Sequence, residues 1–157
     1  TWEFRPLSEV GLCILFFAAE GRSGEDLFDS ALAGRTGEYS QYHSGDMNAF
    51  HISYYRRKEQ EERVFHTCNL RKSHGFHLVA QGADPLPSAG DAVDFYRLSV
   101  TKFKNEIQFM MNDLCIFIFK DDGITYGLPL TKGKIGFRQL APLVAEYRNL
   151  KVYELLT

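Results

Sequence analysis

Apolar and polar positions alternate along most of the chain with a period of two, which is typical of β-strands. One stretch, Leu12–Ala19, is apolar almost throughout, as expected for a strand buried on both faces. Turn-forming residues separate many of the alternating segments. We therefore predict about nine strands: Leu12–Ala19, Ala49–Arg57, Arg63–Arg71, Phe76–Gln81, Phe95–Phe103, Glu106–Met111, Leu114–Lys120, Lys134–Gln139 and Tyr147–Leu155.

A single short segment has the pattern of a helix. Ser23 can act as its N-cap, Asp26 occupies the third helical position, and Gly34 would end it. Its apolar face would consist of Leu27, Phe28, Ala31 and Leu32. Because the strands follow one another without intervening helices, the chain is predicted to be all-β. We expect a two-sheet antiparallel β-sandwich with one short helix, forming a single domain over residues 1–157.

Charge and hydropathy exclude two classes of partner. Lys and Arg number 18 against 20 Asp and Glu, a net charge of −2, so the chain lacks the basic character of a nucleic-acid binder. The longest apolar run, Val10–Ala19, is shorter than the roughly 18 residues needed to span a bilayer. We predict neither a nucleic-acid nor a membrane partner.

The cysteines and the N-terminus bear on location. Cys13, Cys68 and Cys115 are odd in number and lie in apolar segments, which favours reduced, buried thiols in a cytoplasmic protein. The chain begins at Thr1 without a methionine, so we expect preceding strands to be missing, and secretion stays open. No zinc-ligand spacing or phosphate-binding glycine loop occurs, and no metal or cofactor is predicted. Asp121-Asp122-Gly123 favours a hairpin turn over a calcium site.

Strand periodicity places many polar side chains on one face of a sheet. If the second and third predicted strands form a hairpin, their polar positions line a common surface, and the fourth strand adds two more. This predicted polar face consists of His51, Ser53, Tyr55, Arg57, Thr67, Asn69, Arg71, His77 and Gln81. These side chains offer flat hydrogen-bonding groups, which favours a ligand groove.

Two kinds of chemistry suit such a face. The Glu-x-Asp-x-Glu strand of laminarinase-type hydrolases is absent, which weighs against a retaining glucanase. β-Elimination from a uronate needs a group that neutralises the substrate carboxylate, and a base that removes the acidified α-proton. We predict His51 or Tyr55 as the base or acid. Asn69 and Arg71 would bind the acidic or carbonyl group of the substrate. Simple sugar binding would use the same residues.

Long stretches of the sequence resemble a known family. They are LCILFFAAEGRSGEDLFD, YSQYHSGDMNAFHISYYRR, NLRKSHGFHLVAQGADPLP and GKIGFRQLAPLVAEYRNLKVYEL. Together they closely resemble the YesU-like family of bacterial proteins, a domain of unknown function. The resemblance implies a concanavalin A-like, galectin-like jelly roll with a concave, carbohydrate-facing surface. It also implies that family members are longer than this chain and take part in bacterial polysaccharide breakdown. It assigns no catalytic residue.

Further candidate ligand contacts lie in these stretches at positions that are polar or aromatic. The predicted substrate-binding residues are Arg35, Tyr39, Tyr42, Asn69, His77, Gln81 and Arg138. Arg35 follows the predicted helix and Arg138 lies on a late strand, so both could reach the mouth of the groove, although either could tie loops to the sandwich instead.

Three functional hypotheses follow. The first is an enzyme of carbohydrate catabolism, with lyase-type β-elimination or related proton abstraction, acting on an oligosaccharide or polysaccharide. The second is a non-catalytic, galectin-like carbohydrate-binding module. The third is a structural sandwich whose open strand edges bind a protein partner, which would also suit a homo-oligomer.

Overall fold

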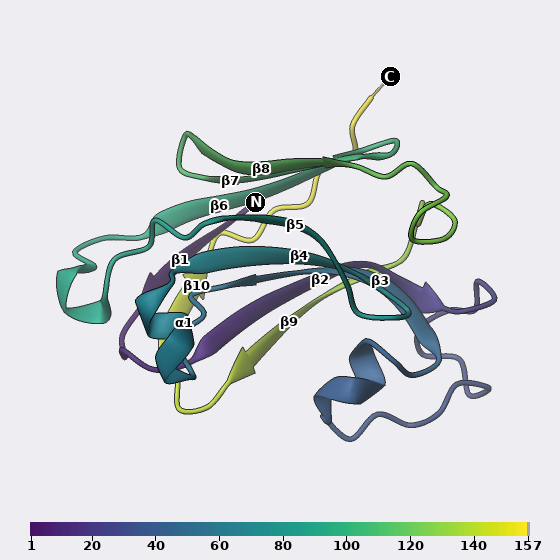
Figure 1. The fold of residues 1–157 in the computed structure, drawn as a ribbon, viewed down its shortest axis with the longest axis horizontal. Helices are drawn as coiled ribbons and strands as arrows, with labels where there is room; N and C mark the ends of the chain where they lie inside the picture. The colour runs from purple at the N-terminus through teal and green to yellow at the C-terminus, as the bar shows by residue number, and fades with distance from the viewer. Residues whose placement is uncertain (157) are drawn as a thin grey trace.

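Residues 1–156, described here by a computed structural model, form two five-stranded antiparallel sheets that face each other (Figure 1). Sheet A has the order β10-β1-β6-β7-β8, and sheet B has the order β5-β4-β3-β2-β9. The strands are β1 Trp2–Pro6, β2 Leu12–Gly21, β3 Met47–Tyr54, β4 Thr67–Ser73, β5 His77–Ala83, β6 Tyr96–Phe103, β7 Glu106–Met111, β8 Leu114–Lys120, β9 Lys134–Leu140 and β10 Ala145–Arg148. The predicted all-β, two-sheet class is confirmed.

The main core lies between the two sheets and is rich in aromatic rings. Trp2 of β1 stacks on Phe109 of β7, with ring centroids 6.5 Å apart. Its indole nitrogen donates a hydrogen bond to the buried hydroxyl of Tyr54 (3.3 Å). Phe4 meets the Tyr54 ring edge-on at 5.4 Å. Most of the phenylalanine and tyrosine that the sequence carries in its strands therefore serves to join the sheets.

A second apolar cluster lies on the outer face of sheet B, away from sheet A. It consists of Ile14, Phe16, Ala19, Met47 and Ala49, with Leu27, Tyr39 and Tyr42 packed against it. The last three residues belong to the long connection between β2 and β3, which contains the short 3₁₀ helix η1 Tyr39–Tyr42. Central parts of strands β2 and β3 are therefore buried on both faces.

Two irregular segments frame this outer face. In Figure 1 the strands of sheet B arch, and the blue connection that contains η1 lies below one end of the arch. The helix α1 Gln60–Val64 lies below the other end. A second 3₁₀ helix, η2 Ala89–Asp91, lies in the connection between β5 and β6. The outer face of sheet B is thus the hollow side of the arch.

The predicted helix after Ser23 is wrong. Residues 23–34 form turns, because Asp26 and Asp29 each accept a hydrogen bond from the backbone N–H two residues further on, at 3.0 and 2.8 Å. Such turns compete with the helix that the same residues could cap. Gly24, with φ of 91°, lies in the left-handed region where a regular helix cannot continue.

Three further parts of the strand assignment differ most from prediction. The start of the predicted strand Arg63–Arg71 is taken up by α1, which a capping box between Glu59 and Glu62 stabilises. Of the last predicted strand, Tyr147–Leu155, only Tyr147 and Arg148 lie in a strand, β10, and Asn149 follows with φ of 55°. Strand β1 was not predicted, although its buried residues alternate with partly exposed ones.

One buried ion pair joins sheet B to the connection after β8. Lys72 Nζ donates to Asp121 Oδ2 (2.7 Å) and to the carbonyl of Gly127 (2.8 Å). Both charged side chains are only 3% exposed. The same Asp121 accepts from the N–H of Gly123, so the predicted hairpin-type turn at Asp121-Asp122-Gly123 serves to hold this connection on β4.

We predict that Lys72→Met destabilises the protein by about 3–5 kcal/mol, because Asp121 would be left buried without its cation. The free energy of unfolding from urea titration measures the effect. Arg97→Met is the matched control, since the Arg97–Asp113 pair is 57% and 96% exposed and should contribute less than about 1 kcal/mol. Equal losses in the two variants would contradict the prediction.

Candidate functional site

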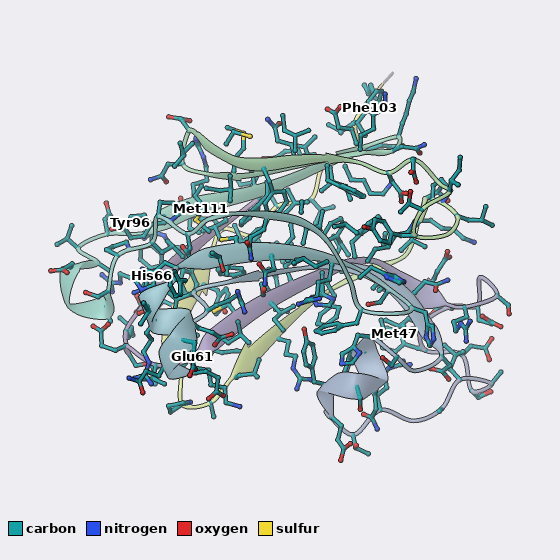
Figure 2. The ribbon with its side chains drawn as sticks, in the orientation of Figure 1. Met47, Glu61, His66, Tyr96, Phe103 and Met111 are labelled. Carbon is teal, nitrogen blue, oxygen red and sulfur yellow. The ribbon has the colours of Figure 1, made fainter. Side chains whose placement is uncertain are left out.

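Two rows of side chains cross the outer face of sheet B from β9 to β5. The strand register aligns Arg138, Ile14, Ser53, Asn69 and Gln81 in one row. It aligns Gly136, Phe16, His51, Arg71 and Leu78 in the other. Figure 2 shows that side chains fill the space between the sheets, while others extend from the outer side of sheet B between α1, where Glu61 is labelled, and the segment near Met47.

At the centre of this face, Tyr39 covers His51. The Tyr39 hydroxyl lies 2.9 Å from His51 Nε2, and the ring of Phe16 packs against the imidazole with centroids 5.0 Å apart. His51 is fully buried. Burial, assisted by the positive charge of Arg71, lowers the pKa of His51 to about 3, so the imidazole is neutral. His51 can therefore act on a ligand only through Tyr39.

Arg71 lies beside this pair on β4. Its guanidinium stacks over Phe76 at 3.9 Å from the ring centroid and donates to the Phe76 carbonyl (2.9 Å). The Phe76 ring in turn lies against Tyr39 and His51, with centroids 5.6 and 5.9 Å apart. Arg71 remains partly exposed. Phe76 thus fixes the stem and plane of Arg71 and leaves other N–H groups for a ligand.

Arg138 approaches Tyr39 from β9, on the opposite side. Its guanidinium lies 5.4 Å from the Tyr39 ring centroid and 5.2 Å from that of Tyr42. A pocket of about 220 Å³ lies next to it, between β9 and the connection that carries η1, with Phe16 and Tyr42 in its wall. Within residues 1–156, Arg138 Nε is buried and has no hydrogen-bond partner.

A separate polar network lies toward α1. The amides of Asn69 and Gln81 meet at 2.7 Å. With the amide of Asn69 turned so that its oxygen faces Arg56, it accepts a hydrogen bond from Arg56 Nη1 at 2.9 Å. Arg56 also pairs with Glu62 of α1 (2.9 Å). Asn69 is buried and positions the others, whereas Gln81 is exposed and free to contact a ligand.

The structure therefore brings most of the predicted site residues onto one face. The set on or over the outer face of sheet B is Tyr39, Tyr42, His51, Asn69, Arg71, Gln81 and Arg138. Tyr42 packs on Phe16 at 5.7 Å and supports Arg138. The remaining three predicted residues, Arg35, Tyr55 and His77, lie elsewhere.

Tyr55 does not belong to this face. Strand β3 ends at Tyr54, and Tyr55 has φ of 47°, which breaks the alternation and turns its side chain into the main core. There it packs against Phe4, and its hydroxyl donates to the carbonyl of Ser8 (3.0 Å). The expectation that Tyr55 acts as an acid or base on the polar face is corrected by this placement.

His77 is also placed on the opposite face. A register shift in the pairing of β4 with β5, between Leu70 and Arg71, changes the alternation along β5. Gln81 stays opposite Asn69, but His77 comes to lie opposite Lys72 and packs near Tyr126 with ring centroids 5.1 Å apart. One irregular residue thus moves His77 away from Arg71.

Arg35 has a structural role. It donates to the carbonyl of Leu27 and lies 3.8 Å from Asp46, so it holds the connection between β2 and β3 together.

Of the cysteines, Cys13 and Cys68 are buried as predicted, but Cys115 is exposed on the edge strand β8.

The sequence did not identify three residues that shape the site. Arg56 lay in the predicted strand Ala49–Arg57 without a role, and neither Glu62 nor Phe76 was among the predicted ligand contacts. For Arg56, the only signal in the sequence was the pair of adjacent arginines, Arg56-Arg57. Phe76 has φ of 58°, a backbone conformation that alternation does not predict, and this conformation lets it cover His51.

Among residues 1–156, no group of three or more metal-ligating side chains occurs, and no helix is long and apolar enough to cross a membrane.

The two facing sheets define a β-sandwich of the galectin-like class, with a polar outer face on sheet B. The family model for a domain of unknown function, DUF1961, matches residues 1–152, and the chain belongs to this family. It is 60% identical over 154 residues to the protein YesU of Bacillus subtilis (strain 168), covering 98% of this chain and 70% of that protein. The resemblance to the YesU-like family is confirmed.

Solved structures agree with this assignment. A Bacillus subtilis protein of unknown function with a galectin-like fold superposes with a TM-score of 0.92 at 61% identity, covering 94% of this chain and 67% of that one. The carbohydrate-binding module CBM66 from Bacillus subtilis superposes with a TM-score of 0.51 at 11% identity, covering 94% and 71%. The second likeness is one of fold.

We predict that His51 makes stability depend on pH. Its folded pKa of about 3 lies below the unfolded value of about 6.5, so the unfolded chain binds the proton more readily. The free energy of unfolding should fall as the pH drops from about 6.5 toward 3, by up to about 1.4 kcal/mol per pH unit from this group.

Urea titrations at several pH values, on the wild type and His51→Gln, measure this contribution. In His51→Gln, the contribution of this histidine to the pH dependence of the unfolding free energy should be lost. In His66→Gln, where the replaced histidine is exposed, that pH dependence should be retained. Identical slopes for the wild type and His51→Gln would show that His51 is not held neutral.

Proposed function

We propose that this protein binds oligosaccharides on the outer face of sheet B. The observation that carries the proposal is the set of flat polar side chains on that face. Arg71, Gln81 and Arg138 are partly or fully exposed, and Arg71 and Arg138 flank the aromatic group around Tyr39. Sugars are bound by such hydrogen-bonding planes next to aromatic rings, because hydroxyl groups need directed partners and the ring C–H faces need apolar contact.

Two further observations support a carbohydrate ligand. The hollow side of an arched sheet offers an extended surface, which fits a chain of sugar rings (Figure 1). A module described as carbohydrate-binding also shares the fold. Fold alone does not specify a ligand, so the polar face remains the main argument.

The geometry favours binding over cleavage. Abstraction of a proton from a sugar needs a base with an exposed atom at the ligand. His51 is fully buried with Nε2 engaged by Tyr39, and Tyr55 lies in the main core. Burial also raises the pKa of the Tyr39 hydroxyl, so this group stays protonated and does not offer a phenolate as the base. A non-catalytic sugar-binding protein therefore fits these residues better than a lyase.

We predict that Gln81→Ala weakens oligosaccharide binding about tenfold, which corresponds to the loss of one hydrogen bond to the ligand. Isothermal titration calorimetry against a panel of plant and bacterial oligosaccharides measures the affinity. Gln108→Ala on sheet A is the matched control and should leave the affinity unchanged.

The same mixtures are followed by absorbance for unsaturated uronate ends. Binding without product is the expected result, and release of unsaturated ends would instead support the lyase hypothesis. No binding to any oligosaccharide, or equal losses in Gln81→Ala and Gln108→Ala, would contradict the proposed function.

A further inference from the structure

The outer face of sheet B carries more positive than negative charge. Arg56, Arg71 and Arg138 point onto it, and only Arg56 has a carboxylate partner there. On the strands of sheet A, by contrast, each arginine is paired: Arg5 with Glu146, Arg97 with Asp113 and Arg148 with Glu3. Within residues 1–156, no carboxylate lies within 4.0 Å of Arg71 or Arg138.

Both of these arginines are held in place but incompletely hydrogen-bonded. Each guanidinium has five N–H donors. Arg71 donates one hydrogen bond, to the Phe76 carbonyl, and Arg138 donates none within residues 1–156. Their planes are fixed by stacking on Phe76 and on Tyr39 and Tyr42, respectively. Fixed donors of this kind lose little freedom when a ligand binds.

The buried imidazole of His51 orients a third donor, the Tyr39 hydroxyl. His51 is neutral, so only one of its two nitrogens carries a hydrogen. Nδ1 is buried without a partner within the described chain, and Nε2 faces the Tyr39 hydroxyl at 2.9 Å. A hydrogen on Nδ1 would be a buried N–H with no acceptor, which proteins avoid. The hydrogen therefore sits on Nε2 and is donated to the Tyr39 oxygen.

This tautomer decides what Tyr39 offers to a ligand. Because its oxygen already accepts a hydrogen bond from His51, the phenol hydrogen is left to be donated away from His51. Arg71 and Arg138 are the charges that act most strongly on this hydroxyl. Three groups that can only donate, or are left to donate, thus meet at Tyr39: its own O–H, and the guanidinium groups of Arg71 and Arg138 on either side of it.

A ligand group that matches this arrangement must be an acceptor without hydrogens of its own, and it must be negatively charged. Resting on the proposed function, we propose that the group of Tyr39, Arg71 and Arg138 binds the carboxylate of a uronic acid residue in the oligosaccharide. A planar carboxylate fits the planar N–H pairs of arginine better than a neutral hydroxyl does. His51 acts as a positioning residue through Tyr39.

Calorimetry with matched acidic and neutral ligands tests the proposal. The probes are oligosaccharides of galacturonate, glucuronate and mannuronate, the methyl ester of each, the corresponding neutral sugars and a sulfated galactose oligomer. At least one acid should bind about tenfold or more tightly than its methyl ester. Its affinity should also fall as the salt concentration rises.

Variants connect that preference to the named residues. Arg71→Gln and Arg138→Gln should each reduce the affinity for the acid toward that for its ester, whereas Arg97→Gln on sheet A should retain the full difference. Tyr39→Phe should also reduce the difference, because the phenol hydrogen is lost. Circular dichroism confirms that each variant is folded.

The outcomes separate this inference from the proposed function. Binding of neutral sugars or esters as tightly as the acids would overturn the carboxylate site and leave oligosaccharide binding intact. Tighter binding of the sulfated oligomer than of every uronate would also overturn it, in favour of a sulfate ligand. An absence of binding to every sugar would contradict the proposed function, and the inference with it.

Discussion

Burial of β3 on both of its faces is the constraint on which the site depends. One face supplies Tyr54 and other residues to the core between the sheets, and the other is covered by the connection that contains η1. The covering segment must satisfy the polar atoms that it buries, because an unpaired polar group in an apolar setting costs about 1–3 kcal/mol. The contact between Tyr39 and His51 satisfies one of these atoms and fixes η1 on the sheet.

That constraint divides the outer face into positioning and contact residues. His51 and Asn69 come from the central part of the sheet and are buried, so each works through a neighbour. Arg71, Gln81 and Arg138 lie on β4, β5 and β9, nearer the sheet's edges, where the covering segment leaves them partly exposed. His51 is therefore a residue of a type suited to acid–base chemistry, but its buried position at the centre of the face makes it orient Tyr39 instead.

Alternation in the sequence was sufficient to predict the fold class and much of the polar face. His51, Asn69 and Arg71 share a face because β3 and β4 are regular where they pair. The errors occur where a single residue leaves the regular conformation, as with the positive φ of Tyr55 and the register shift opposite His77. Such local changes depend on tertiary contacts, for example between Tyr55 and Phe4, that no pattern of hydrophobicity records.

The distribution of charge is not explained by folding alone. With 18 basic and 20 acidic residues, the chain has enough carboxylates to pair its arginines, and on sheet A it does so. On the outer face of sheet B, Arg71 and Arg138 instead stack on aromatic rings. Partly burying two cations without carboxylate partners is unfavourable for stability. A ligand that supplies a negative charge gives this arrangement a physical reason, because a carboxylate bound at Tyr39 would offset part of the positive charge of the two guanidinium groups.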